Sequence, residues 1–438
     1  MKFATEQELL DYTKNIIGKT FKELDKLNLL QKGQADKGIL GKIVETGFYN
    51  YPLNSNPEAD FSELGIELKV TGFIRNKNKT IRAKERISLS MIDYNNIIHE
   101  EYEFSKLISK NKKLLIIWYE YTKENQNNKG EFVIHYYQLY DMSIDELVFK
   151  NDFNLIKSKV IAGLAHELSE GDTSYLGAAT KGNGQTKPQP NSDILAPTRA
   201  FSLKQPYITG ILRNLNLNPL PLKAKTVEDF IYDKIRSYIG MTQIKIWDTL
   251  GEKKYSLDNL PKQINKMISD RLIGKDKELP KLDDIFSKTS YIIKNISFEE
   301  NGYPKERVSF RNLTLSEFEE PWENSDLKEY FEQVTIIFIC YEGTKGDKNG
   351  QRKLKTVKKL AFTSDDLDNF KLSYDAIRKT IKTKDISNLP VPGSFEKQYL
   401  ELAPKGNAGD DAYNNFFLKD TTKTCFMLEK DFVFNKLN

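Results

Sequence analysis

The sequence predicts an α/β protein made of two tandem copies of one domain, each with a mixed central sheet flanked by helices. Strand-like apolar runs alternate with amphipathic helical stretches, short motifs recur in the same order in both halves, and a Pro- and Asn-rich connector separates the halves. At 438 residues the chain is too long for one ordinary core. We expect a first domain at 1–213, a linker at 214–225 and a second domain at 226–438.

The internal repeat rests on motifs that keep their order and nearly constant spacing, which favours a duplicated domain over chance similarity. The matched segments are 84–88 with 305–309, 114–120 with 335–342, 175–176 with 399–400, 181–183 with 405–407, and 201–204 with 426–429.

Apolar periodicity predicts the elements of the first copy. The run LLIIWY is almost entirely apolar and predicts a buried central strand. A Gly-, Asn- and Pro-rich stretch between two apolar segments predicts a long functional loop. The expected helices are 6–28, 38–48 and 153–168, the expected strands are 65–73, 86–92 and 114–121, and the expected loop is 180–197.

Composition excludes several classes of function. The 66 basic and 62 acidic residues give a net charge of +4, too small to identify a nucleic-acid binder by itself. The start lacks the pattern of a signal peptide and no apolar run could span a bilayer, so a cytoplasmic location is expected. Cys340 and Cys425 are expected to be buried free thiols. His99, His135 and His166 stand far apart, which argues against zinc hydrolases and Ser-His-Asp chemistry.

The stretch 60–69, DFSELGIELK, carries the candidate chemistry. On a strand, Glu67 and Lys69 point to one face and Leu68 to the other. Asp60, just before the strand, can turn its carboxylate to the same place. Two carboxylates and the Leu68 carbonyl form an oxygen-rich site that suits Mg²⁺, which would activate water for phosphodiester hydrolysis. The bare pattern is equally compatible with an exposed edge strand carrying ion pairs.

Three segments resemble the MutH mismatch-repair endonuclease and the two-domain, GATC-cutting type II restriction enzymes of the Sau-3A-I type. These segments are 36–45 (DKGILGKIVE), 60–69 and 198–204 (TRAFSLK). The resemblance covers about residues 1–213 directly and the second half through the repeat. It implies a restriction-endonuclease-like fold of the PD-(D/E)xK nuclease superfamily in each copy, and the two-domain length favours the restriction-enzyme branch.

The resemblance also implies roles for individual residues. Asp60 and Glu67 would bind Mg²⁺, Lys69 would be the catalytic lysine, and Glu45 would be an additional active-site carboxylate. Lys37 matches a family lysine near the DNA, although a solvated lysine at a helix start would look the same. A further active-site lysine would be Lys112 or Lys113, which the sequence does not distinguish.

The implied substrate is double-stranded DNA, cut before the G of GATC to leave 5′ overhangs. Residues suited to phosphate and guanine contacts lie between 175 and 204. Ser202 stands where the mismatch-repair enzyme has a tyrosine implicated in sensing adenine methylation, so we expect cutting to be insensitive to that methylation. The expected DNA-binding residues are Lys181, Lys187, Arg199, Ser202 and Lys204, with Lys405 in the second copy.

The repeat places Ile292 opposite Glu67 and Lys294 opposite Lys69, with Asp283 or Asp284 opposite Asp60. Because isoleucine cannot ligate Mg²⁺, we expect the second copy to be catalytically inactive. We infer that it binds DNA, either engaging a second GATC or acting as an effector and dimerisation element, as the resemblance implies. The alternative is a structural relic that only stabilises the first domain. The alternatives to a restriction enzyme are a mismatch-repair-type nicking enzyme and a catalytically silent DNA-binding regulator.

Overall fold

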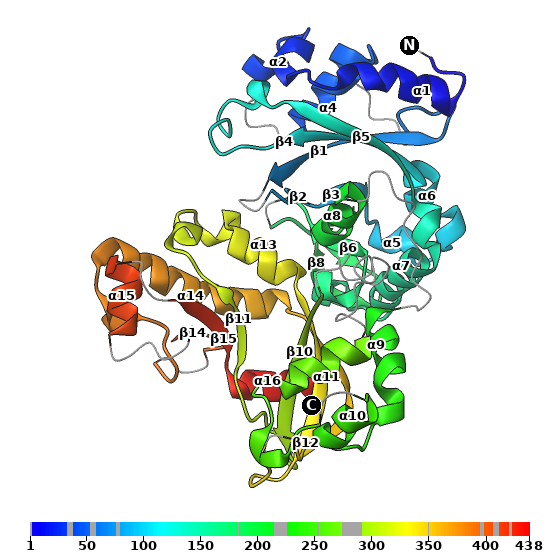
Figure 1. Ribbon diagram of the computed structural model, residues 1–438. Coiled ribbons are helices and arrows are strands. Elements are labelled where there is room, and N and C mark those ends of the chain that lie inside the picture. The colour runs from blue at the N-terminus through cyan, green and yellow to red at the C-terminus, as the bar shows by residue number, and fades with distance from the viewer. Residues whose placement is uncertain are drawn as a thin grey trace. The chain divides into compact units, whose positions relative to one another are not determined.

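The computed structural model describes most of the chain, and it divides into two compact units (Figure 1). Unit 1 holds the described residues up to Leu168 and from Asp172 to Arg213, and unit 2 holds those from Thr226 on. The predicted linker 214–225 lies outside the described residues. The described ranges are 2–32, 38–52, 58–75, 79–182, 184–213, 226–251, 254–273, 291–348, 350–394, 398–405, 411–419 and 423–438.

The main sheet of unit 1 has the strand order β2-β1-β4-β5, with β1 parallel to β4 and both edge strands antiparallel to their neighbours. Its strands are β1 (Ile66–Arg75), β2 (Ile81–Ala83), β4 (Lys113–Glu120) and β5 (Ile134–Asp141). The apolar β4 lies inside the sheet and is buried over nearly its whole length, as predicted.

One face of this sheet packs against the N-terminal helices, which lie along it in Figure 1. Leu9, Phe21 and Ile43 from these helices share one core with Leu68 and Ile117 of the sheet. The helices are α1 (Glu6–Thr13), α2 (Phe21–Leu24), α3 (Leu29–Lys32) and α4 (Ile39–Ile43).

A second, antiparallel sheet of unit 1 has the order β3-β9-β6. Its strands are β3 (Ile87–Met91), β6 (Leu176–Thr180) and β9 (Arg199–Leu203). The neighbouring helices are α5 (Tyr94–Ile97), α6 (Lys106–Asn111), α7 (Glu146–Ile161) and α8 (Gln205–Arg213).

Unit 2 repeats this plan. Its first sheet pairs β10 (Tyr291–Glu299) in parallel with β12 (Thr335–Gly343), which pairs antiparallel with β13 (Lys353–Leu360). Its second sheet has the order β11-β15-β14. The remaining elements are β11 (Val308–Asn312), β14 (Leu400–Pro404), β15 (Thr424–Leu428), α9 (Val227–Ile235), α10 (Gln243–Thr249), α11 (Ile264–Ile273), α13 (Asp326–Gln333), α14 (Ser364–Thr383), α15 (Ala412–Lys419) and α16 (Lys430–Leu437).

Strand register confirms the repeat alignment. In unit 1, Glu67 pairs with Leu114 and Lys69 with Ile116. In unit 2, Ile292 pairs with Ile336 and Lys294 with Phe338. The two matched central strands both end in Tyr-Glu, at Glu120 and Glu342, so Leu114 corresponds to Ile336 and Ile116 to Phe338. Two independent pairings therefore agree that Ile292 occupies the position of Glu67.

The second sheets agree in register as well. Ser202 pairs with Ser88 and Gly177, and its counterpart Met427 pairs with Ser309 and Glu401. The alignment of 201–204 with 426–429 is thereby confirmed.

Three expected elements differ in the structure. The helix expected at 6–28 is broken after η1 (Lys14–Ile16), because Gly18 adopts a φ of +82° that the helix cannot continue through. The helix expected at 153–168 is α7, which begins seven residues earlier and ends at Ile161. The loop expected at 180–197 contains a hairpin of β7 (Thr186–Gln189) and β8 (Ser192–Pro197).

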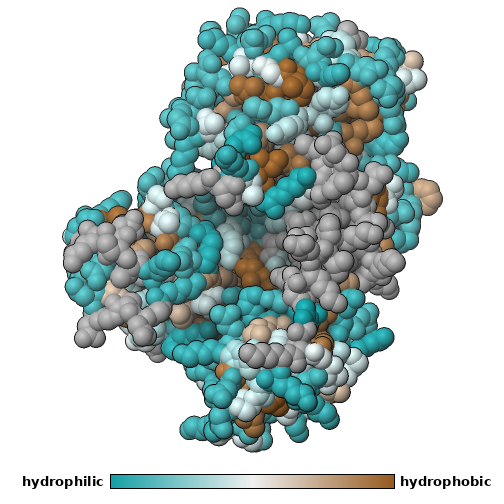
Figure 2. Space-filling view, in the orientation of Figure 1, coloured by the Kyte–Doolittle hydropathy of each residue, from teal (hydrophilic) through white to brown (hydrophobic). Residues whose placement is uncertain are grey.

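Other features match the sequence. Both cysteines are buried free thiols. None of the described helices is long and apolar enough to cross a membrane. The face of the molecule seen in Figure 2 is mostly hydrophilic, with smaller apolar areas between, which fits a chain with 29% charged residues.

Candidate active site

Strand β1 places Glu67 and Lys69 side by side. Ile66 and Leu68 belong to the core under α1, α2 and α4, so the alternation of the strand turns Glu67 to the opposite face. Glu67 is only 5% exposed there. The Lys69 ammonium lies 2.9 Å from Glu67 Oε1 and compensates the buried carboxylate.

Asp60 is tied to this strand by two hydrogen bonds. The backbone N–H of Leu68 donates to Asp60 Oδ2 at 2.9 Å, and the backbone N–H of Asp60 donates to Glu67 Oε2 at 3.3 Å. The tight turn between Asp60 and β1 thus brings together two carboxylates that are seven residues apart in the sequence.

Glu45 reaches the same place from the helical segment that precedes. Helix α4 continues into a π-helical turn at Val44–Phe48, where the Tyr49 N–H donates to the Val44 carbonyl at 3.1 Å. Such wide turns are frequent at functional sites. Burial, and then the negative charges of Asp60 and Glu67, raises the pKa of Glu45 to about 7.

The three carboxylates carry more negative charge than the site neutralises. Burial, followed by the charge of Glu67, raises the pKa of Asp60 to about 6. A site that raises the pKa of its own carboxyl groups is one that an additional cation would stabilise. The donor set is all oxygen, as Mg²⁺ prefers. Among the described residues, no group of three or more His, Cys, Asp and Glu side chains lies in positions that could hold a metal ion.

The structure brings Lys110 to the carboxylates, rather than Lys112 or Lys113. Lys110 Nζ lies 3.6 Å from Glu67 Oε1. Lys112 is exposed at the C-cap of α6, and Lys113 pairs with Glu6. Positions 110 and 112 point about 200° apart around a helix, so only one of them can face the site.

A sequence signal for Lys110 existed. Ser105 caps α6 by accepting from the Ile108 N–H, and a serine before a short apolar-periodic stretch is a helix-start signal. A helix that begins at this signal has Lys110 and Lys112 on opposite faces, so only one of the two lysines can face the carboxylates. Lys37, also expected near the site, lies outside the described residues.

The expected DNA-binding lysines differ in their surroundings. Lys181 is half-buried and donates to Ser88 Oγ, and Lys187 is half-buried on β7. Lys405 in unit 2 is exposed and donates to the Phe310 carbonyl at 2.9 Å. All three remain near enough to the surface for a contact with a large ligand.

The other three expected DNA contacts are buried, which corrects the expectation that they face DNA. Arg199 is 3% exposed and donates to the Ala178 carbonyl at 2.7 Å across the β6–β9 pair. Lys204 is also 3% exposed and donates to the Thr173 carbonyl at 2.5 Å, beside buried Asp152. Ser202, on the central strand of its sheet, is fully buried. The two cations hold the second sheet together.

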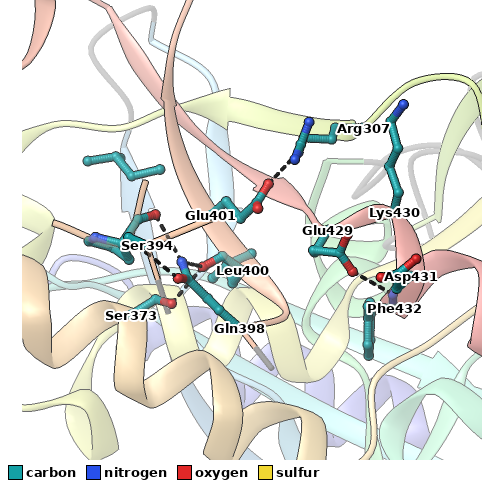
Figure 3. Close-up of polar contacts among 12 residues, drawn as sticks. Arg307, Ser373, Ser394, Gln398, Leu400, Glu401, Glu429, Lys430, Asp431 and Phe432 are labelled. Atoms are coloured by element: carbon teal, nitrogen blue, oxygen red, sulfur yellow. Dashed lines mark hydrogen bonds and ion pairs between the residues drawn. The ribbon is translucent and has the colours of Figure 1, made fainter. Parts of the chain in front are cut away.

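Unit 2 has different residues at the corresponding places (Figure 3). The counterpart of Lys204 is Glu429, which accepts from the Phe432 N–H at 2.9 Å and caps α16. The counterpart of Gly177 is Glu401, which accepts from Arg307 Nε at 2.5 Å. The second sheet of unit 2 is therefore held by a different set of polar contacts.

In the described part of unit 2, the first sheet has no counterpart of Glu67. Ile292 replaces Glu67 and packs against the apolar core of its unit. On α11, the nearest counterpart of the Glu45 segment, Ser269 donates to Asn295 Oδ1 at 2.5 Å and Asp270 pairs with Lys266. Asp283 and Asp284 lie outside the described residues.

Comparison with known proteins agrees with this geometry. The family described as DNA mismatch repair enzyme MutH matches residues 49–152, which include Asp60, Glu67, Lys69 and Lys110. The type II restriction enzyme Sau3AI of Staphylococcus aureus is 30% identical over 409 residues, covering 87% of this chain and 81% of that enzyme. That match spans both units. The chain therefore belongs to the MutH/Sau3AI-type family of restriction endonucleases.

Proposed function

We propose that unit 1 hydrolyses double-stranded DNA at GATC, before the G, as a Mg²⁺-dependent type II restriction endonuclease. The observation that carries this proposal is the cluster of Asp60, Glu67 and Glu45 with Lys69 and Lys110 at the end of a parallel strand pair. The sequence specificity is transferred from the resemblance to GATC-cutting enzymes.

Asp60, Glu67 and the Leu68 carbonyl would hold Mg²⁺. Because the Leu68 N–H donates to Asp60, the carbonyl of the same residue faces the same edge of β1. β2 pairs only with the far end of β1, from Phe73 to Arg75, and leaves this part of the edge uncovered by a strand. When bound, the ion supplies charge neutralisation at the phosphate and an acidified water.

The remaining residues act on the water and on the charge that develops at the phosphate. Lys69 would orient the attacking water and stabilise its deprotonated form. Lys110, which approaches the same Glu67 oxygen as Lys69, would add positive charge where the phosphodiester becomes more negative. The pKa of about 7 at Glu45 belongs to the protein without an ion, and Mg²⁺ bound beside it would favour the charged carboxylate.

Unit 2 would bind DNA without cutting it. Ile292 removes the carboxylate that the mechanism requires, and the exposed Lys405 remains. With one active centre per chain, a double-strand break requires two chains on the DNA or two successive nicks. Unit 2 would engage a second GATC or support that dimerisation.

Cutting should be insensitive to adenine methylation. This expectation rests on the resemblance: Ser202 stands where the mismatch-repair enzyme has the tyrosine implicated in sensing that methylation, and serine has no aromatic ring.

Mapping the ends produced from a GATC-bearing duplex with Mg²⁺ tests the proposal. Four-base 5′ overhangs are expected, with no product in EDTA or with Glu67→Gln. Nicks in one strand alone, without partner proteins, would favour the mismatch-repair-type nicking enzyme. Binding of DNA without any cleavage would favour a silent regulator.

A further inference from the structure

A cavity of about 820 Å³ lies in unit 2, between its second sheet and the helices α14 and α16. The described residues that line it all belong to unit 2. The stacked rings of Tyr399 and Phe432, 4.6 Å apart, form an apolar part of its wall. Asp365 and Asp431 are exposed, so the cavity opens to solvent. Its volume is that of a site for a small molecule.

Carboxylates outnumber cations in the lining of this cavity. Both basic residues of the described lining are engaged: Arg307 donates to Glu401, and Lys436 Nζ lies 2.6 Å from Asp366 Oδ2. The stretch 395–397 lies outside the described residues, and its sequence, Phe-Glu-Lys, has no net charge. The lining has an excess of three negative charges, which favours a ligand with several positive charges. Its acidic residues are Asp365, Asp366, Glu401, Glu429 and Asp431.

Unit 1 has a buried ammonium group at the corresponding place. The backbone N–H of Lys204 donates to the Tyr175 carbonyl at 3.0 Å. In the same way, the backbone N–H of Glu429 donates to the Tyr399 carbonyl at 3.0 Å. Glu429, which Figure 3 shows at the start of α16, therefore takes the position of a lysine that is 3% exposed.

The partner of that lysine has changed as well. In unit 1 the Lys204 ammonium donates to the Thr173 carbonyl, and Asp152 accepts from the N–H of the next residue, Ser174, at 2.8 Å. Asp152 also accepts from the Tyr175 N–H at 2.7 Å. In unit 2 the corresponding contact is made by a neutral amide of the cavity lining, because Asn369 Oδ1 accepts from the Tyr399 N–H at 3.0 Å.

The duplicated fold thus has an ammonium group of its own at this place in unit 1, and a carboxylate beside an open cavity in unit 2. We propose that the cavity of unit 2 binds a linear polyamine, with one ammonium group at Glu429, where unit 1 has the Lys204 ammonium. Ammonium groups are donors only and match carboxylate acceptors. The methylene segments between them pack against the rings of Tyr399 and Phe432, as the stems of long cationic side chains do on apolar surfaces.

The test measures the binding of spermidine to the full-length chain in EDTA, without DNA, by isothermal titration calorimetry. Saturable binding of one spermidine per chain is expected, with a rise of the melting temperature. A neutral diol of similar length should do neither, because it has no charge for the carboxylates. An absence of saturable spermidine binding would overturn the proposal.

Single variants locate the site. Glu429→Gln removes the charge and keeps an oxygen that can cap α16, so the affinity for spermidine should fall about 10-fold. Asp431→Asn, at an exposed position of the lining, should weaken binding by up to about 5-fold. Glu323→Gln, which removes an exposed carboxylate paired with Lys328, is the matched control and should bind as the wild type does. Equal affinity of Glu429→Gln and the wild type would place spermidine elsewhere on the chain.

A double variant that copies unit 1 gives the sharpest comparison. Asn369→Asp with Glu429→Lys supplies the carboxylate and the ammonium group that Asp152 and Lys204 supply in unit 1. The chain should stay folded and should no longer bind spermidine, whereas binding as tight as that of the wild type would contradict the proposed place.

The methylamide of N-acetyl-lysine separates the two sources of an ammonium group. Binding as tight as that of spermidine would assign the cavity to a lysine side chain of a protein and overturn the polyamine. Neither DNA nor Mg²⁺ is present in these measurements, so their outcome is independent of the proposed reaction.

Discussion

Ile292 occupies on β10 the position that Glu67 occupies on β1, as the pairing of each strand with its central neighbour shows. The same fold therefore contains a buried carboxylate in one unit and a branched alkyl group in the other. Since the sheet accepts both residues, the fold alone does not require a carboxylate at this position.

Replacing Glu67 by isoleucine, the residue at the corresponding position of unit 2, should strongly slow cutting without unfolding the protein. We expect Glu67→Ile to lower the cleavage rate about 10³-fold, because a ligand to the ion and the partner of Lys69 are lost together. Cleavage of a GATC duplex with Mg²⁺ and thermal unfolding are the measurements. Ile292→Leu is the control and should cut normally. Persistent cleavage by Glu67→Ile would show that the active centre is elsewhere.

Lys110 should contribute to the reaction and Lys112 should not. Lys110→Met removes a positive charge 3.6 Å from Glu67, so the rate of a single turnover should fall about 10²-fold. Lys112→Met changes an exposed side chain of the same segment and should leave the rate unchanged. A slower reaction of Lys112→Met together with an unchanged rate for Lys110→Met would support Lys112, the lysine assigned from the sequence.

Lys204 should matter for stability rather than for DNA binding. Its ammonium is buried beside Asp152, which also accepts from the N–H groups of Ser174, Tyr175 and Leu176 at 2.7–2.9 Å. Lys204→Met leaves that carboxylate without its cation and should destabilise unit 1 by about 3 kcal/mol. Chemical denaturation measures the loss. An unchanged stability together with weaker DNA binding would return Lys204 to the DNA interface.

Plasmid DNA with and without N6-methyladenine at GATC should be cut at equal rates. The expectation rests on Ser202, which stands where the mismatch-repair enzyme has the tyrosine implicated in sensing the methyl group. Complete protection of the methylated plasmid would contradict the expectation, and the residue that senses the methyl group would then lie in another part of the chain.

The sequence was sufficient to predict those features that depend on a single segment of the chain. The alternation around Glu67 and Lys69 is a property of the strand itself, and the apolar run of β4 can only be central. The repeat was readable because the strand motifs kept their spacing.

The sequence did not predict which charged residues are buried. Arg199 and Lys204 have the composition of DNA contacts, but their environment is set by Ala178, Thr173 and Asp152, which come from other segments. A charge becomes structural only when tertiary partners surround it. Lys110 was missed for a different reason, because a helix of six residues gives a weak periodic signal.

The 2.9 Å contact between Lys69 and Glu67 gives the buried carboxylate a counter-charge before any ion is bound. A cation that binds beside Glu67 would compete with the ammonium for this carboxylate. Ion binding at the site and the strength of the Lys69–Glu67 ion pair are therefore expected to be coupled, so that one weakens as the other forms.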